Sequence, residues 1–273
     1  MAENKKSKSK SSGHLIAPTV VAIGGIDPSA GAGLFMDQLA IRHTGCDFAG
    51  ICATLTLQNG IEFLQSNPQP APDVENALRL LQQTKSIAAI KTGALGTAEI
   101  IEVICRFVSA HPHIRLIVDP VLKSTTGGAL MRGDSEDAYV RRLLSFATLI
   151  TPNRLEAERL SGMAIRNIPE METAARRLID QGARGVLIKG GHLDSIDAID
   201  ILALPDQPVV HLVSERLAIG EVRGTGCALA SLIAGRIALG DSMVYGVKKA
   251  RNTLLGAMKS AHFPATGPGI LHF

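Results

Sequence analysis

The chain has 273 residues, of which 46% are hydrophobic and 3% aromatic, so it can supply the core of one fairly large domain. Its formal net charge is +3, and four lysines against one glutamate among the first ten residues account for that excess. The remainder is balanced in charge, which argues against a basic nucleic-acid-binding face, and no apolar run is long enough to cross a membrane.

The N-terminal segment differs in composition from the rest of the chain. Residues 1–18 are rich in lysine and serine, so we expect a disordered basic tail there, without a secretory signal. Residues 19–273 are then expected to form one folded domain. The four cysteines include no C-x-x-C pair and are not spaced with histidines as zinc ligands would be, which predicts a reducing, cytoplasmic setting.

Apolar runs of strand length alternate with amphipathic segments of helix length along the chain. In chain order we predict a strand at 20–24, a helix at 34–44, a strand at 48–57, a helix at 72–84, a strand at 88–92, a helix at 98–108, a strand at 114–118, a helix at 134–146, a strand at 148–152, a helix opening at 153, a helix at 169–181, a strand at 185–189, two strands or a hairpin at 198–204 and 209–213, and helices at 227–239 and 242–260. This alternation predicts a mostly parallel, doubly wound α/β sheet.

A short loop of Gly224, Thr225 and Gly226 leads directly into the predicted helix at 227–239. The first N–H groups of a helix have no intrahelical partners, and the helix dipole makes that end partly positive, so this loop is a candidate anion cradle. Cys227 falls in the first turn, where a thiolate is favoured. Taken alone, however, the motif favours a plainer interpretation, a glycine-rich helix start with a small buried cysteine.

Charged and amide side chains follow several of the predicted strands. Asp119 ends a buried strand, where a carboxylate is costly unless it binds something, and Mg²⁺ is a usual partner. Asn153 and Glu156 lie three positions apart at the start of a helix, so they either bind a ligand together or only form a capping box. Their spacing alone favours the capping box. Lys189 leaves another strand and either reaches a phosphate or is simply solvated.

The loop after the first strand, GIDPSAGAG at 25–33, lets a ligand approach the backbone closely. It does not fit the dinucleotide fingerprint, because the third glycine would fall at Met36. Asp27 is the polar contact expected from this loop. Gln58 ends the second strand beside an Asn-Gly turn signal, and is either a ligand contact or an ordinary turn residue.

Because parallel strands end at one edge of a sheet, polar and small residues at their ends are expected to converge. The converging positions are Asp27, Gln58, Gly93, Asp119, Lys189 and Gly224. An anion cradle, a metal-binding acid and a phosphate-binding lysine together predict a phosphoryl-transfer site that works by positioning and electrostatics. The sequence contains neither a G-x-x-x-x-G-K-[ST] loop nor the protein-kinase motif set, which excludes those two classes.

Six motifs occur in a specific order, namely GIDPSAGAG at 25–33, QN at 58–59, VDPV at 118–121, TPNRLEA at 151–157, KGGH at 189–192 and GTGC at 224–227. In this order they resemble the hydroxymethylpyrimidine/phosphomethylpyrimidine kinase family of the ribokinase-like superfamily, which serves thiamine biosynthesis. The resemblance implies a three-layer α/β/α kinase domain at 19–273 without a separate lid domain. It also implies a homodimer that adds two phosphates in turn from MgATP, first to the alcohol of 4-amino-5-hydroxymethyl-2-methylpyrimidine and then to the monophosphate.

The same resemblance implies roles at the donor side of the site. Cys227 would be the base for the hydroxymethyl group, and the N–H groups of residues 224–227 would form the anion hole. The residues implied for the nucleotide are Lys189, Asn153 and Thr225 at the ATP phosphates, and Asp119 and Glu156 at Mg²⁺.

At the acceptor side, Gln58 would bond the aminopyrimidine edge through its amide donor and acceptor. The residues implied to line the substrate pocket with it are Asp27, Ala32, Gly33 and Val121. Ala94 stands where the family commonly has Met, which makes this wall smaller and the choice of ring less certain. A pyridoxal or pyridoxine kinase of the same fold and a non-catalytic, pyrimidine-binding regulatory protein therefore stay open as alternatives.

Overall fold

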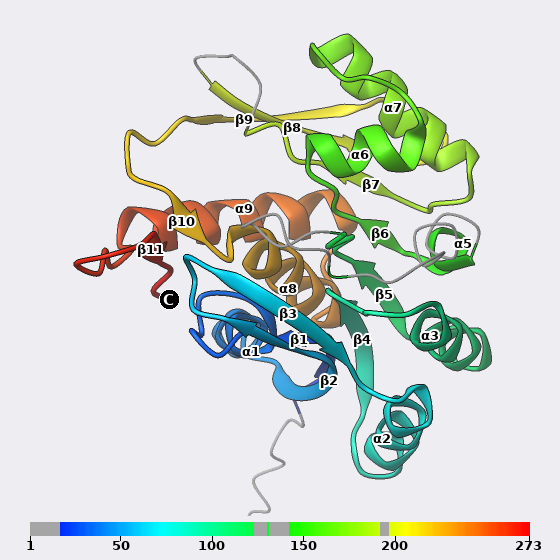
Figure 1. Cartoon of the computed structure of the whole chain (residues 1–273). Coiled ribbons are helices and arrows are strands. Elements are labelled where there is room, and N and C mark those ends of the chain that lie inside the picture. Colours follow the sequence, from blue (N-terminus) through cyan, green and yellow to red (C-terminus); the bar gives the residue numbers. More distant parts are fainter. Residues whose placement is uncertain (1–16, 123–129, 131–141, 192–196) are drawn as a thin grey trace, which may run out of the picture.

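The computed structural model describes residues 17–122, 130, 142–191 and 197–273. Its centre is a nine-stranded sheet with the order β3-β2-β1-β4-β5-β6-β7-β8-β9 (Figure 1). The strands are β1 (Thr19–Ile26), β2 (Asp47–Gln58), β3 (Phe63–Pro68), β4 (Ile87–Thr92), β5 (Arg115–Val118), β6 (Leu149–Ile150), β7 (Val186–Ile188), β8 (Asp197–Ala203) and β9 (Val210–Glu215).

The middle of this sheet is parallel and its two margins are antiparallel. The strands β2, β1, β4, β5, β6 and β7 pair in parallel, whereas β3 pairs antiparallel with β2, and β8 pairs antiparallel with both β7 and β9. The predicted mostly parallel sheet is thus confirmed, and the two strands predicted near 198–213 form the hairpin that the sequence left open.

Helices cover both faces of the sheet, as predicted (Figure 1). They are α1 (Gly33–His43), α2 (Ala71–Thr84), α3 (Ala98–Ala110), α5 (Leu144–Phe146), α6 (Arg154–Ser161), α7 (Ile168–Asp180), α8 (Thr225–Ala238) and α9 (Met243–Lys259). Successive strand residues point to opposite faces. Val20 and Ala22 of β1 therefore share a core with α1, α8 and α9, whereas Val21 and Ile23 share the other core with α2, α3, α6 and α7.

Three strands escaped the sequence patterns. The edge strand β3 contains Gln65, Ser66 and Asn67, so its main-chain bonds to the long β2, rather than an apolar alternation, define it. The strands β10 (Val222–Arg223) and β11 (Gly269–Ile270) form a separate parallel pair that ties the residues before α8 to the end of the chain. Such short strands carry no periodic signal.

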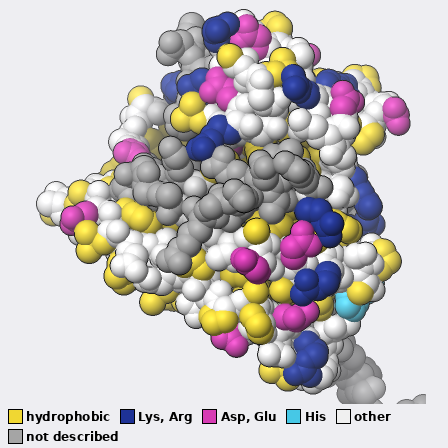
Figure 2. Space-filling model, turned by 45° about the vertical axis from the view of Figure 1, so that its right-hand side comes forward, with side chains coloured by type: hydrophobic (Ala, Val, Ile, Leu, Met, Phe, Trp, Pro, Cys, Tyr) yellow, Lys and Arg dark blue, Asp and Glu magenta, His cyan; other side chains and the backbone are white. Residues whose placement is uncertain are grey.

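Two predicted segments lie wholly or largely outside the described residues. The described part of the predicted basic tail is limited to residues 17–18, and the predicted helix at 134–146 is described only from residue 142 onward, where α5 begins at Leu144. Within the described part of the chain, no helix is both long and apolar enough to cross a membrane. On the face seen in Figure 2, basic and acidic side chains are interspersed.

Candidate active site

A cavity of about 990 Å³ opens where the parallel strands end, and its size is at the upper end of the usual range for ligand pockets. Every residue that the sequence predicted for the site lines it, namely Asp27, Ala32, Gly33, Gln58, Asp119, Val121, Asn153, Glu156, Lys189, Gly224, Thr225, Gly226 and Cys227. The structure therefore brings the predicted residues together, while their separate roles stay predictions.

The N-terminus of α8 forms one wall of the cavity. Gly224 is its N-cap with φ of +72°, and a Cβ atom there would lie 2.3 Å from the carbonyl oxygen of Gly31. A Cβ atom on Gly226 would lie 3.2 Å from the Lys189 Nζ. Glycine is thus required at Gly224 by both conformation and space, and at Gly226 it leaves the backbone open to the cavity. The unpaired N–H groups of this first turn consequently face the charged end of the site.

Lys189 and Asp119 form an ion pair at the edge of the sheet. The Lys189 Nζ lies 3.2 Å from Asp119 Oδ1, and the Thr151 hydroxyl donates to the same oxygen over 3.4 Å. Although burial acts to lower it, the charges of Asp119 and Glu156 hold the pKa of Lys189 above its usual value. Lys189 is therefore a permanently charged group held beside the cradle rather than a solvated lysine.

Asn153 and Glu156 make the capping box that their spacing favoured. Asn153 Oδ1 accepts a hydrogen bond from the Glu156 N–H over 2.9 Å, and Glu156 Oε2 accepts one from the Asn153 N–H over 2.8 Å. Both residues also line the cavity, so the cap and a ligand-binding role are compatible. Burial raises the pKa of Glu156 to about 7; the charge of Lys189 opposes this effect, and the charge of Asp119 adds to it.

These carboxyl groups suit a magnesium ion that is shared with a nucleotide. Asp119 and Glu156 are close enough for the charge of Asp119 to raise the pKa of Glu156, and a divalent cation between them would relieve that repulsion. The described residues contain no cluster of three or more His, Cys, Asp or Glu that could hold a metal. Mg²⁺ commonly binds through one or two carboxylates and takes its other ligands from water and phosphate. The residues present therefore fit Mg²⁺ on a phosphate chain better than a permanently bound ion.

The helix position of Cys227 predicted a thiolate, and this prediction is wrong. Burial raises the pKa of Cys227 to about 12, and the charges of Asp119 and Asp37 add to this effect, while the charge of Lys91 opposes it. The loss of hydration thus outweighs the helix end, which favours a thiolate at more exposed sites. At neutral pH the thiol is protonated.

A fully buried ion pair lies beneath Cys227 and was not predicted. Lys91 on β4 donates from Nζ to Asp37 Oδ1 of α1 over 2.7 Å, and both side chains are 0% exposed. Ser231, one helical turn after Cys227 on α8, donates to the same oxygen over 2.8 Å. Burial acts to lower the pKa of Lys91, but the carboxylate of Asp37 holds it above its usual value. The sequence signal for this pair was a lysine within an apolar strand and an aspartate on the core face of a helix, because charged residues are rarely buried unless they are paired.

Small residues form the opposite wall, on the loop after β1. Ala32 is the N-cap of α1, and a Cβ atom on Gly33 would lie 2.3 Å from the Gly25 carbonyl oxygen. Val121 follows Asp119 at the end of β5, and Ala94 follows β4. With so little side-chain bulk, a flat ring can approach the backbone closely here.

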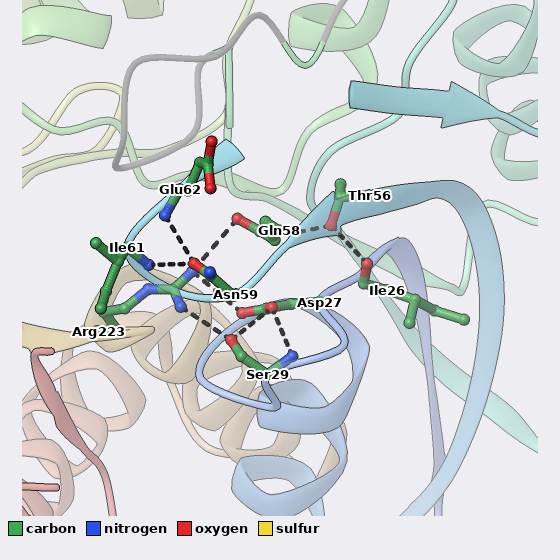
Figure 3. A network of polar contacts seen from close by, with 9 residues as sticks. All are labelled: Ile26, Asp27, Ser29, Thr56, Gln58, Asn59, Ile61, Glu62 and Arg223. Carbon is green, nitrogen blue, oxygen red and sulfur yellow. Dashed lines mark hydrogen bonds and ion pairs between the residues drawn. The ribbon is translucent and has the colours of Figure 1, made fainter. Parts of the chain in front are cut away.

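Arg223 is another charged residue that the sequence patterns missed (Figure 3). It directly precedes Gly224 and contacts Asp27 and Ser29 of the loop after β1, as well as Gln58 at the end of β2. Its only sequence signal was a charge placed immediately before the glycine cradle. The predicted pocket residues Asp27 and Gln58 are therefore connected to the cradle through one guanidinium group.

The far end of the cavity is more apolar and is supported by β8, β9 and α9. Leu217, Ile219 and Met258 line it. Asp200 of β8 also lines the cavity, and it accepts hydrogen bonds from the Gly190 N–H over 2.9 Å and from Arg251 Nε over 2.8 Å. Asp200 thereby anchors the backbone immediately after Lys189.

A family model described as phosphomethylpyrimidine kinase matches residues 27–272. The chain belongs to the phosphomethylpyrimidine kinase family. The match begins at Asp27 and extends beyond α9, so it includes all of the predicted site residues.

Two curated relatives of this phosphomethylpyrimidine kinase family member illustrate the range of similarity. The hydroxymethylpyrimidine/phosphomethylpyrimidine kinase of Haemophilus influenzae is 33% identical over 242 residues, which cover 88% of this chain and 90% of that protein. A chloroplastic thiamine biosynthetic bifunctional enzyme of Arabidopsis thaliana is 34% identical over 255 residues and 93% of this chain. The chain spans about half of that plant enzyme, 49% of its length.

A solved structure of a different vitamin kinase is also similar. The pyridoxal kinase of Staphylococcus aureus, in complex with AMP-PCP and pyridoxal, matches this chain with a TM-score of 0.83 and 28% identity over 93% of each chain. The predicted ribokinase-like, three-layer α/β/α fold is thereby confirmed. Phosphotransfer is the activity common to these named kinases.

We predict that Gly224→Ala impairs phosphotransfer by displacing the cradle. An alanine at φ of +72° costs about 1–2 kcal/mol in backbone strain. The added Cβ would also collide with the Gly31 carbonyl, 2.3 Å away. Gly45→Ala is the matched control, because Gly45 has φ of +92° but nothing within 4 Å of its added Cβ. The thermal unfolding temperature should fall in both variants, whereas phosphotransfer activity should fall only in Gly224→Ala. Full activity in Gly224→Ala would contradict the prediction.

We predict that Glu156→Gln changes how stability depends on pH. The pKa of Glu156 is about 7 in the folded chain and 4.5 ordinarily, so ionisation of this group opposes folding as pH rises from about 4.5 to 7. Glutamine keeps the capping box and cannot ionise. Without divalent cations, the unfolding free energy of the variant should match wild type near pH 4 and exceed it by up to about 3 kcal/mol above pH 7. The unfolding free energies are measured by urea denaturation at each pH. A difference between variant and wild type that stays constant with pH would refute this prediction.

Proposed function

We propose that the protein phosphorylates 4-amino-5-hydroxymethyl-2-methylpyrimidine from ATP and then phosphorylates the monophosphate to the diphosphate, as a part of thiamine biosynthesis. The main support is geometric, because the amide cradle of α8, Cys227 and the Asp119–Lys189 pair line one cavity. The names of the relatives agree with this acceptor. The nucleotide analogue in the similar pyridoxal kinase supports ATP as the donor.

The donor is assigned to the end of the cavity that carries Lys189. Lys189, Asn153 and Thr225 would contact the phosphates, and the apolar wall near Met258 would receive the base. Asp119 and Glu156 would hold Mg²⁺, which supplies positive charge to the phosphate oxygens when it is bound. The free N–H groups of Gly224 to Cys227 would stabilise the negative charge that develops during transfer.

The acceptor is assigned to the wall formed by Asp27, Ala32, Gly33, Gln58 and Val121. The Gln58 amide offers both a donor and an acceptor to the edge of an aminopyrimidine ring. In this position the hydroxymethyl group would lie beside the cradle.

Cys227 would take the proton of the acceptor hydroxyl. A thiol whose pKa lies near 12 must first lose its own proton, and the charge of Lys91 favours that loss by lowering the pKa of Cys227. The base form therefore becomes more populated as the pH rises. Lys91 would serve this step through its positive charge, whereas the charge of its partner Asp37 opposes the loss of the thiol proton.

An assay of ATP turnover with a small panel of acceptors tests the proposal. The panel is the aminopyrimidine alcohol, its monophosphate, pyridoxal and pyridoxine, with the phosphorylated products identified by mass. We expect kcat/KM to be highest for the aminopyrimidine alcohol. A preference for pyridoxal would indicate the pyridoxal kinase alternative, and tight binding without turnover would indicate a non-catalytic binding protein.

We predict that Cys227→Ala lowers the rate of the first phosphorylation by about 10²–10⁴, the usual contribution of a general base. In the wild type, that rate should increase with pH above neutrality, because the thiolate is the minor form below the pKa of about 12. Cys105→Ala is the matched control, since Cys105 is buried in the core on the opposite face of the sheet. Wild-type turnover in Cys227→Ala would remove Cys227 from the mechanism.

We also propose that the protein is a homodimer that pairs through the β2–β3 edge of the sheet. This edge exposes large apolar side chains, with Leu57 42% exposed on β2, Leu64 70% exposed on β3 and Ile61 62% exposed in the turn between the strands. Among the strands that the structure describes, β3 is the edge strand on this side of the sheet. Exposed apolar groups on an edge strand are typical of a surface that a second copy covers.

We predict that Leu64→Lys separates the two copies, because a charged side chain on an edge strand opposes association. Sedimentation equilibrium should give the dimer mass for wild type and the monomer mass for this variant. Leu239→Lys, at an exposed apolar residue at the end of α8, is the control and should leave the mass unchanged. A monomeric wild type would refute the proposal.

We assign the protein to the cytoplasm. All four of its cysteines are free thiols, which is typical of a reducing compartment. Detection of the tagged protein only in a membrane or secreted fraction would contradict this assignment.

A further inference from the structure

Arg223 is the centre of a polar network that joins three separate segments of the acceptor wall (Figure 3). Its Nη2 lies 3.1 Å from Asp27 Oδ2 and donates to Gln58 Oε1 over 3.4 Å. Its Nη1 donates to the Ser29 hydroxyl over 3.0 Å. One guanidinium group therefore reaches both the loop after β1 and the end of β2, and it belongs to the residue that precedes the cradle.

The position of this guanidinium group is closely defined by its surroundings. The Arg223 side chain is only 6% exposed. A Cβ atom on Gly60 would lie 2.5 Å from Nη1, and one on Gly31 would lie 3.3 Å from it. The space that the guanidinium occupies thus depends on the absence of side chains on both flanks. Because Arg223 is surrounded in this way and is paired with Asp27, it has little freedom to turn away from Gln58.

The other end of the Gln58 amide is held by Thr56. The Thr56 hydroxyl donates to the carbonyl oxygen of Ile26 over 2.8 Å, which uses its single hydrogen. Towards Gln58 this hydroxyl can therefore only accept, and it does so from Nε2 over 2.9 Å. Figure 3 shows Thr56, Gln58 and Arg223 in sequence along the wall.

These two contacts allow a single orientation of the amide. A guanidinium group contains donors only, so it requires the Gln58 oxygen on its side, while Thr56 requires the nitrogen on the other. A rotated amide would place N–H groups against Arg223 and oxygen against oxygen at Thr56. The Gln58 side chain lines the cavity with one N–H and one oxygen lone pair still unused, and their order along the wall is set by this arrangement.

We propose that Arg223 and Thr56 determine which heterocycle the site accepts, by holding the Gln58 amide in one orientation. The inference rests on the proposed function and names the chemical pattern that is selected, an amino group next to a ring nitrogen. The free oxygen lone pair accepts from the amino group, and the free N–H donates to the ring nitrogen. At the equivalent positions pyridoxal carries a formyl oxygen and a phenolic oxygen, so its formyl group would face the Gln58 oxygen without a hydrogen between them.

Arg223 and Thr56 are positioning residues, because they act on the acceptor through Gln58. Their substitution should change the choice between acceptors without affecting the nucleotide. Thr56→Val removes the acceptor for Nε2 and leaves the ion pair of Arg223 with Asp27 intact. Thr56→Ser keeps the hydroxyl and is its matched control. Arg223→Lys keeps a charge beside Asp27 but lacks the planar fork that reaches Gln58 as well.

The experiment measures kcat and KM for the aminopyrimidine alcohol and for pyridoxal, and KM for ATP, in wild type and the three variants. In Thr56→Val and Arg223→Lys, the ratio of kcat/KM for the aminopyrimidine to that for pyridoxal should fall by about tenfold or more, the effect of losing one well-placed hydrogen bond. The change should come mainly from KM of the aminopyrimidine. Thr56→Ser should retain the wild-type ratio, and KM for ATP should stay the same throughout.

The possible failures can be told apart. A wild type that prefers pyridoxal, or turns over neither acceptor, overturns the proposed function and this inference with it. A wild type that prefers the aminopyrimidine, with the same ratio in Thr56→Val and Arg223→Lys, overturns only the inference. Should Arg223→Lys fail to fold, Thr56→Val decides the matter, and calorimetric binding of the aminopyrimidine alone to Thr56→Val should show the same loss of affinity.

Discussion

A direct backbone contact between Gly224 and Gly31 places the N-terminus of α8 against the loop that follows β1. The start of α8 and the loop after β1 could not lie so close together if residue 224 carried a side chain. The electrostatic effect of a helix end fades within its first turn, so the amide cradle can serve only a ligand that is held immediately beside it. This contact is what makes the cradle and the acceptor wall parts of one cavity, and Arg223 reinforces it from the preceding residue.

The charged groups around the cavity form two sets, one fully buried and one at the cavity surface. Lys91 and Asp37 are completely buried and form an ion pair, and Ser231 donates to the same carboxylate oxygen of Asp37 as Lys91 does. Buried ions are tolerated when they are paired in this way, and they impose a definite electrostatic field on what lies above them. Nearer the opening, Lys189 offsets Asp119, while the charge of Asp119 still disfavours ionisation of Glu156. The site thus has a neutralised floor and an excess of carboxyl groups at the end proposed for the metal and nucleotide.

The fold does not by itself decide the acceptor. A pyridoxal kinase matches this chain closely in structure and is bound to a ring with a different pattern of donors and acceptors. The same scaffold therefore serves more than one vitamin precursor, and the difference must lie in a few side chains at the acceptor wall. In this chain the small Ala94 and the Gln58 amide line the wall proposed for the acceptor ring, and the Gln58 amide is hydrogen-bonded to Thr56 and Arg223.

Local sequence determined the alternation of strands and helices, the glycine loop that opens α8, the cap at Asn153 and the placement of acids and lysine at strand ends. Each of these depends on residues a few positions apart, so propensity, periodicity and short motifs are sufficient to reveal them. Because parallel strands end at a common edge, even the gathering of the site residues could be anticipated.

Tertiary structure alone decided the pairing of Arg223 with Asp27 and Gln58, of which Gln58 is 165 positions away in the chain, and that of Lys91 with Asp37. It also decided that Cys227 keeps its proton, against the expectation from its place at a helix start. Partners so distant in sequence leave no local pattern, and the loss of hydration that raises the pKa of a thiol exists only once the surrounding elements have packed around it.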